Sequence, residues 1–399
     1  MFVRSVEAVQ AGLVTEGSAA WQCVSVHMRL LQRVGFMRAP GGTGTGGYRA
    51  LVLAVTATYL LQECVYAYQE RNDMSKLSQV MFLLLCHITS IVKQIVFHID
   101  ADRIDQLVES LNEPIYNSAC PRARALLFQT AGSASRLQRS YAGCAALTCT
   151  LWGMFAAWRR ACGRAVEFPF WTGLCTDPPT IFIVILLYSF YVTTLVGLAN
   201  TTMDAFIATI LYQCKTQFTI LRNDFETLPE RAKSLSIKTN EDYERVVMTL
   251  FVNCYHHYQK IIETATLLGH IFGVAILVQF GIGGWILCMA AYKLVSLNIL
   301  SIEFASTALF ILCILTELFL YCYYGNELTV ESDKLVCSVY CMRWQRAPPR
   351  FRRLLVLVME RARRPLYPTA ASLVPLSLET FIKILKSSYT FYAVLRQTK

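Results

Sequence analysis

The chain has 399 residues, of which 55% are hydrophobic and only 16% are charged, whereas soluble domains carry about a quarter charged residues. This composition excludes an ordinary soluble protein, and the blocks of apolar residues exclude collagen-like and disordered chains. The net charge of +10 does not predict binding to nucleic acid, because the Lys and Arg residues are scattered between the apolar blocks. We therefore predict an all-α membrane protein whose main surroundings are a lipid bilayer.

Seven apolar runs are long enough to cross a membrane, which takes about 20 helical residues. In chain order they are 51–68, 77–97, 141–158, 180–212, 264–292, 294–324 and 366–395. Prolines at 365, 368 and 375 interrupt the start of the last run, which leaves open whether it forms one helix or two. We expect residues 1–27 to form a poorly ordered extension.

These runs divide the chain into six segments. We expect a cytoplasmic N-terminal segment at 1–49, helices one to four with their loops at 50–213, and a cytoplasmic helical extension at 214–263. Helices five and six follow at 264–325, a cytoplasmic loop with further helices at 326–365, and the last membrane helix at 366–399. The segments between runs two and three and between runs four and five have helical periodicity and mixed charges, which predicts helices that continue beyond the bilayer.

The loop charges predict the orientation. With the N-terminus inside, the cytoplasmic segments hold 26 of the 37 Lys and Arg residues and the external loops hold six. Because cytoplasmic loops keep an excess of Lys and Arg, we expect a cytoplasmic N-terminus and an extracellular C-terminus. This orientation is opposite to that of a G-protein-coupled receptor.

Motifs for enzymatic chemistry, cofactors or metals are not recognisable. The Gly-rich stretch at 41–47 lacks the GK[ST] ending of a phosphate-binding loop, and the adjacent His256 and His257 point about 100° apart on a helix. We predict neither an enzyme nor a cofactor or metal site. Cys162 and Cys175 share a predicted external loop, where a disulfide and two free thiols are both possible.

Ionisable residues inside the apolar runs must face protein or water, because a charge in the bilayer costs several kcal/mol. For Asp204 and Glu303 two interpretations stay open: burial among helices, or a place near the interface of a long tilted helix. Glu317 lies deeper in its run, which favours burial. The last run adds three more ionisable residues, Glu379, Lys383 and Lys386.

The last run ends in an amphipathic pattern. Steps of three and four residues from Lys383 give a mostly polar stripe, which consists of Ser387, Thr390, Val394 and Thr398. Several copies of such a helix could line a pore with one apolar station at Val394. The alternative is that the helix buries its hydroxyl groups against its own bundle.

The last quarter of the sequence resembles the insect odorant receptor family. The residues that carry the resemblance are LYCYYGNELTVES at 320–332 and RRPLYPTAASLVPLSLETFIKILKSSYTFYAVLRQ at 363–397, with weaker similarity at 28–40 and 167–179. The resemblance implies a ligand-gated, non-selective cation channel in the plasma membrane of olfactory sensory neurons. It further implies an odorant-tuned subunit that joins an odorant co-receptor in a heterotetramer, since the long insertion of the co-receptor between spans four and five is missing.

The same resemblance implies roles for the end of the chain. Val394 falls on the hydrophobic gate of the pore, Gln397 on the polar position beside it, and Thr398 on a second constriction. Thr398 departs from the family, which often has Leu at this position, so the co-receptor would supply an apolar ring there.

An apolar and aromatic site for a small volatile ligand is expected in the outer half of the bundle. Residues at suitable depth on spans two, three, four and six are Met81, Phe82, Leu85, Trp152, Phe155, Tyr188, Tyr191 and Phe304. A related gustatory receptor is the nearest alternative, but its C-terminal motif is only partly met by Thr390-Phe391 and Gln397-Thr398. A G-protein-coupled receptor conflicts with the loop charges, and a secondary transporter would show repeated halves.

Overall fold

The structure is a computed structural model that describes residues 18–38, 45–118, 120–164, 166–174, 178–295, 297–345 and 347–397. Its elements are almost all helical. The helices are α2 (Ala19–Arg33), α3 (Thr45–Gln69), α4 (Met74–Ile99), α5 (Ala101–Ser110), α6 (Pro121–Ala161), α7 (Pro179–Glu226), α8 (Leu228–Thr239), α9 (Tyr243–Val295), α10 (Ile302–Cys341), α11 (Pro349–Ala362) and α12 (Leu378–Gln397). A 3₁₀ turn, η1, covers Pro114–Tyr116, and a hairpin joins β1 (Thr369–Ala370) to β2 (Val374–Pro375).

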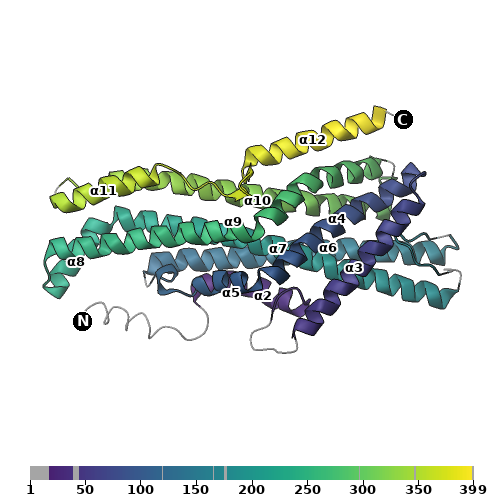
Figure 1. The fold of residues 1–399 in the computed structure, drawn as a ribbon, viewed down its shortest axis with the longest axis horizontal. Helices are drawn as coiled ribbons and strands as arrows, with labels where there is room; N and C mark the ends of the chain where they lie inside the picture. Colours follow the sequence, from purple (N-terminus) through teal and green to yellow (C-terminus); the bar gives the residue numbers. More distant parts are fainter. Residues whose placement is uncertain are drawn as a thin grey trace.

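Four long helices, α6, α7, α9 and α10, run side by side along the longest axis of the molecule (Figure 1). The 53 residues of α9 span about 80 Å at 1.5 Å per residue, far more than the roughly 30 Å hydrocarbon core of a bilayer. We call the end that carries α8 and α11 the extension end. The opposite end, which carries the α3–α4, α6–α7 and α9–α10 connections, is called the pocket end.

Five of the described helices are long and apolar enough to cross a membrane by length and composition: α3, α4, α7, α9 and α10. The third and seventh predicted runs lie on α6 and α12, which do not meet this criterion. Small and hydroxyl-bearing residues lower the hydropathy of α6, and four charged residues lower that of α12.

Two predicted helix starts are wrong. The last helix begins at Leu378 instead of residue 366, because Pro368 and Pro375 place residues 369–375 in the hairpin. Helix α10 begins at Ile302 instead of residue 294, since Ser301 caps its N-terminus by accepting a hydrogen bond from the Phe304 backbone N–H at 3.0 Å. The same helix continues to Cys341, into the segment 326–365 for which we predicted a loop with further helices.

The prediction of a poorly ordered N-terminal extension is wrong from residue 19 onward. The helix α2 starts there, capped by Ser18, and packs against α6 and α7. One of its faces is apolar, and that face carries a completely buried His27. Burial lowers the pKa of His27 to about 4, so this histidine is neutral at physiological pH.

Two glycines allow the hairpin to pack closely against α9 and α10. A Cβ atom at Gly273 of α9 would lie 2.7 Å from the backbone nitrogen of Ala371. A Cβ atom at Gly325 of α10 would overlap the backbone and the side chain of Leu376. The hairpin turn needs Ala371 and Ser372 in the left-handed region, with φ values of 49° and 60°. The backbone contact therefore fixes where α12 begins.

Gly325→Ala should displace the hairpin and destabilise the folded chain by about 1–3 kcal/mol, the usual cost of overpacking. The expected measurement is a lower unfolding temperature of the purified protein in lipid nanodiscs. The matched control is Gly143→Ala on α6, where an added Cβ meets no atom within 4 Å and helix propensity favours Ala. Equal unfolding temperatures for the two variants would contradict the close approach.

Candidate functional site

A cavity of about 170 Å³ lies among the helices at the pocket end. Residues from α3, α4, α6, α7, α9, α10 and the α6–α7 connection line it. For comparison, an engineered cavity of about 150 Å³ with apolar walls binds benzene. The size and the lining suit a small volatile molecule.

One wall of the cavity is aromatic. The ring centroid of Trp152 on α6 lies 6.2 Å from that of Phe82 on α4, and both rings contact Phe310 on α10, at 5.8 Å and 5.1 Å. These edge-on and tilted contacts are the favourable ones for aromatic pairs. Phe82 of α4 and Trp152 of α6 therefore form one aromatic surface of the cavity, to which Phe155 of α6 adds a further ring, and Phe310 of α10 packs against this surface without lining the cavity.

Another part of the lining is Tyr59 of α3, which is 1% exposed. Its hydroxyl group lies 3.4 Å from that of Ser189 on α7. Its ring meets the imidazole of His87 edge-on at 5.4 Å, and the His87 Nδ1 atom is 2.8 Å from the carboxylate of Glu63. The buried pair of His87 and Glu63 thus supports the Tyr59 ring, which lines the cavity.

Two ion pairs border the cavity. Lys293, in the last turn of α9, lies 3.2 Å from Glu303 in the first turn of α10. Lys76 at the start of α4 hydrogen-bonds Glu167 of the α6–α7 connection at 3.2 Å, and this bond raises the pKa of Lys76. All four side chains line the cavity.

The structure brings three of the eight predicted odorant contacts into this cavity: Phe82, Trp152 and Phe155. The other five lie outside its lining. Leu85 packs into the main core, and Tyr188 packs against Tyr59 and bonds Gln62. Tyr191 is 56% exposed on the outer face of α7, while Met81 and Phe304 are half-buried. The position of a residue along a helix does not fix the direction of its side chain, and the role of all eight residues as odorant contacts stays a prediction.

Several lining residues were missed by the sequence analysis. Tyr59 belongs to a helix that was not expected to contribute, and the segment 166–169 comes from a connection. Glu303 was noted only as an ionisable residue, and Lys293 was counted only as one of the six Lys and Arg residues of the external loops. The available signal for the ion pair was the short distance in sequence between Lys293, which separates two predicted runs, and Glu303 near the start of the second of them.

A second buried feature joins α4, α7 and α10 at the middle of the bundle. The ammonium group of Lys93 donates to Asp204 at 2.5 Å, to Glu317, and to Asn200 at 3.1 Å. Tyr321 also donates to Asp204, at 2.5 Å. All three charged side chains are at most 1% exposed. The burial of Glu317 is as predicted, and for Asp204 the buried alternative holds.

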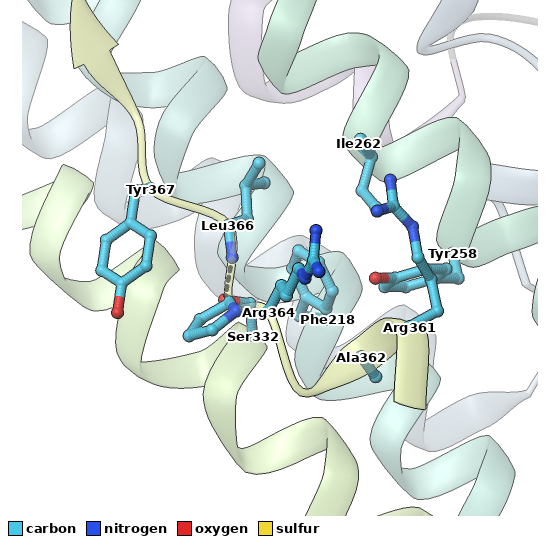
Figure 2. A pocket seen from close by; sticks show the side chains of 10 residues that line it. Phe218, Tyr258, Ile262, Ser332, Arg361, Ala362, Arg364, Leu366 and Tyr367 are labelled. Atoms are coloured by element: carbon cyan, nitrogen blue, oxygen red, sulfur yellow. Dashed lines mark hydrogen bonds between the residues drawn. The ribbon is translucent and has the colours of Figure 1, made fainter. Parts of the chain in front are cut away.

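Another cavity, of about 180 Å³, lies at the extension end, between α7, α9, α10, the end of α11 and the segment that follows it. Figure 2 shows Arg361 beside Tyr258 and Ile262, and the Leu366 N–H bonded to the Ser332 hydroxyl at 2.9 Å. The two arginines of the lining, Arg361 and Arg364, are exposed. The hydrogen bond between Leu366 and Ser332 holds the chain that leads to the hairpin against α10.

Comparison with known proteins decides the family. A profile described as "7tm Odorant receptor" matches residues 73–389, which is most of the chain and includes the hairpin and all lining residues of the cavity except Tyr59 and Tyr66. The chain belongs to the insect odorant receptor family.

The receptor is similar to several curated proteins of Drosophila melanogaster. It is 29% identical to Odorant receptor 85c over 140 residues, 35% of this chain and 36% of that protein. It is 23% identical to Odorant receptor 67c over 204 residues, 51% of this chain and 48% of that protein. The matched part of the receptor therefore spans about a third to a half of the length of these relatives.

The fold of the receptor matches that of a solved olfactory receptor. The structure of OR5 from Machilis hrabei in complex with eugenol superposes with a TM-score of 0.81 and 17% sequence identity, over 94% of this chain and 98% of that one. The structure of the same receptor without eugenol gives a TM-score of 0.80 over the same shares of the two chains. The receptor is a multi-pass membrane protein with this fold.

The receptor's last helix presents its predicted polar stripe to the outside of the single chain. Lys383, Ser387 and Thr390 are exposed, and Val394 is 53% exposed. The Gln397 side chain and the whole of Thr398 lie outside the described residues. Cys175 also lies outside them, so the two alternatives for Cys162 and Cys175, a disulfide and two free thiols, stay open.

Lys93→Met should destabilise the receptor by about 3–5 kcal/mol, because it leaves two buried carboxylates without their cation. The measurement is the free energy of unfolding of the receptor in detergent micelles. The control is Arg363→Gln, which breaks an exposed pair with Glu360 and should cost less than about 1 kcal/mol. Similar free energies of unfolding for both variants would contradict a stabilising role of the Lys93 ammonium group in the cluster.

Proposed function

We propose that this chain is the odorant-tuned subunit of a heteromeric, non-selective cation channel, in which it pairs with an odorant co-receptor. The observation that supports this most directly is the aromatic cavity at the pocket end, on a bundle whose last helix leaves a mostly polar stripe uncovered. The cavity would take a small volatile ligand, and the stripe of several subunits would line the pore. The site would lie in the plasma membrane of olfactory sensory neurons.

Helix α9 offers a physical connection between the two sites. Lys293 at the cavity and Trp285 are eight residues apart on α9, about 12 Å along the helix. The Trp285 ring stacks on Phe391 of α12, with centroids 4.8 Å apart, and an added Cβ at Gly284 would contact Ser388. A ligand that shifts the end of α9 would therefore move α12. It would favour the open state only by binding that state more tightly.

The assembly that we propose is a tetramer with cytoplasmic N-termini and extracellular C-termini. The extension end, built from the long ends of α7, α9 and α10 with α8 and α11, would form the intersubunit anchor. An open groove of about 370 Å³ between α9, the hairpin and α12 would face a neighbouring subunit. Val394 would then form the apolar gate, with Ser387, Thr390, Gln397 and Thr398 along the pore.

Current recording from cells that express this chain with an odorant co-receptor tests the proposal. A volatile panel should evoke a rapid cation current that is absent with the co-receptor alone and persists when G-protein signalling is blocked. Silence, with surface delivery verified and the co-receptor responding to its own agonist, would contradict odorant tuning. Responses to soluble tastants instead would favour a gustatory receptor.

Trp152→Ala should remove the centre of the aromatic wall and raise the half-maximal odorant concentration at least about tenfold, since burying a large aromatic ring is worth several kcal/mol. The measurement is the dose–response curve of the co-expressed channel. The matched control is Trp158→Ala, on the same helix, whose side chain is 48% exposed and does not line the cavity in the described part of the chain. An equal loss of sensitivity in both variants would contradict this site.

Val394→Ser should hydrate the proposed gate, because a hydroxyl-bearing side chain opposes dewetting of a narrow pore. The expected result is a raised basal current or an altered ion permeability in the co-expressed channel. Val184→Ser, at an exposed valine on α7 near the pocket end, is the control and should behave as the unmodified chain. Unchanged conductance, permeability and gating in Val394→Ser would remove this residue from the pore.

A further inference from the structure

The ion pair between Lys293 and Glu303 is unusual for its position. Its two side chains are only 12% and 21% exposed, so water screens their charges less than at an open surface. Both line the cavity, next to the short connection between α9 and α10. Charges at this depth act directly on a molecule that enters.

Lys293 also touches the aromatic wall. Its ammonium nitrogen lies 5.2 Å from the ring centroid of Phe82, within the range of a cation–π contact. Phe82 in turn packs against Trp152. An ammonium group carries three N–H donors, so Lys293 can keep Glu303 and still donate to an acceptor atom of a ligand. A molecule on the aromatic wall would meet this donor at its edge.

The net charge of the side chains that line the cavity determines which ligand charge is preferred. Three cationic side chains, Lys76, Arg159 and Lys293, line the cavity with two anionic ones, Glu167 and Glu303. The excess is one positive charge. An amine would have to displace Lys293 from both Glu303 and Phe82, whereas an oxygen acceptor adds to the existing arrangement.

We propose that Lys293 is the specificity-determining residue of this cavity and selects small volatiles that carry a carbonyl oxygen. The oxygen of an aldehyde, ketone, ester or carboxylic acid accepts a hydrogen bond from the Lys293 ammonium group, while the hydrocarbon part rests on Phe82 and Trp152. Glu303 holds Lys293 in this position. This inference rests on the proposed function, in which the cavity is the odorant site, and adds the chemical class of the ligand.

The test is a binding measurement on the full chain in lipid nanodiscs, by calorimetric titration with four probes that share one ring: benzaldehyde, benzyl alcohol, toluene and benzylamine. Benzaldehyde should bind at least about tenfold more tightly than toluene, as expected for a hydrogen bond to a charged group. Lys293→Met keeps the apolar stem and removes the ammonium group. This variant should lose about tenfold in affinity for benzaldehyde and change toluene binding less than about threefold.

Two further variants separate recognition from misfolding. Lys76→Met removes the other paired lysine of the lining and should keep the preference for benzaldehyde over toluene. Glu303→Gln keeps the Lys293 donor but removes the charge that holds it in position, and should reduce that preference. The inference would be overturned if the unmodified chain bound benzaldehyde and toluene with equal affinity, bound benzylamine most tightly, or bound none of the probes. It would also be overturned if Lys293→Met lost affinity for benzaldehyde and toluene equally.

Channel recordings distinguish this failure from failure of the proposed function. Carbonyl-dependent binding without any odorant-evoked current, in the presence of a working co-receptor, would contradict the channel proposal and keep the role of Lys293. Odorant-evoked currents whose ligand preference is unchanged in Lys293→Met would keep the channel proposal and remove Lys293 as its selector.

Discussion

The ammonium group of Lys93 connects three helices at the centre of the bundle. It binds Asp204 of α7 and Glu317 of α10 from its place on α4, all of them buried. A charge in an apolar interior is tolerated only when it is paired and hydrogen-bonded, so none of these helices can slide or rotate without separating the charges. The cluster thereby fixes the register of α4, which carries Phe82 of the aromatic wall, relative to α7 and α10.

The positions of the two proposed sites, the cavity and the polar stripe of α12, follow from this arrangement of helices. Phe82 lies eleven residues before Lys93 on the same helix, which places it about 16 Å nearer the pocket end. On the other side of the bundle, the hairpin rests against Gly273 and Gly325, and α12 begins where the hairpin ends. The cavity and the last helix are thus connected through α9, which contributes Lys293 to the cavity and Trp285 to the contact with α12.

The two kinds of charged pair in this receptor have different physical consequences. The Lys93 cluster is sealed from the cavity by packing and acts on helix register. The Lys293–Glu303 pair is partly open to the cavity, so that its charges are available to a guest molecule. The difference lies in the surroundings and not in the residue types, since both are lysines paired with carboxylates on neighbouring helices.

The amino-acid sequence by itself determined the class of the protein, because the length and hydropathy of a membrane helix follow directly from the thickness of a bilayer. Its C-terminal motifs also identified the family, and helical periodicity marked the polar stripe from Lys383 to Val394, which the structure leaves exposed. Only the tertiary structure decided where helices begin around Pro368 and Ser301, and which aromatic residues face one another. It also decided that Lys93 meets Asp204 and Glu317, and that Lys293 meets Phe82. These pairings join residues on different helices, and the rotation of each helix about its axis depends on its neighbours, which local sequence patterns do not specify.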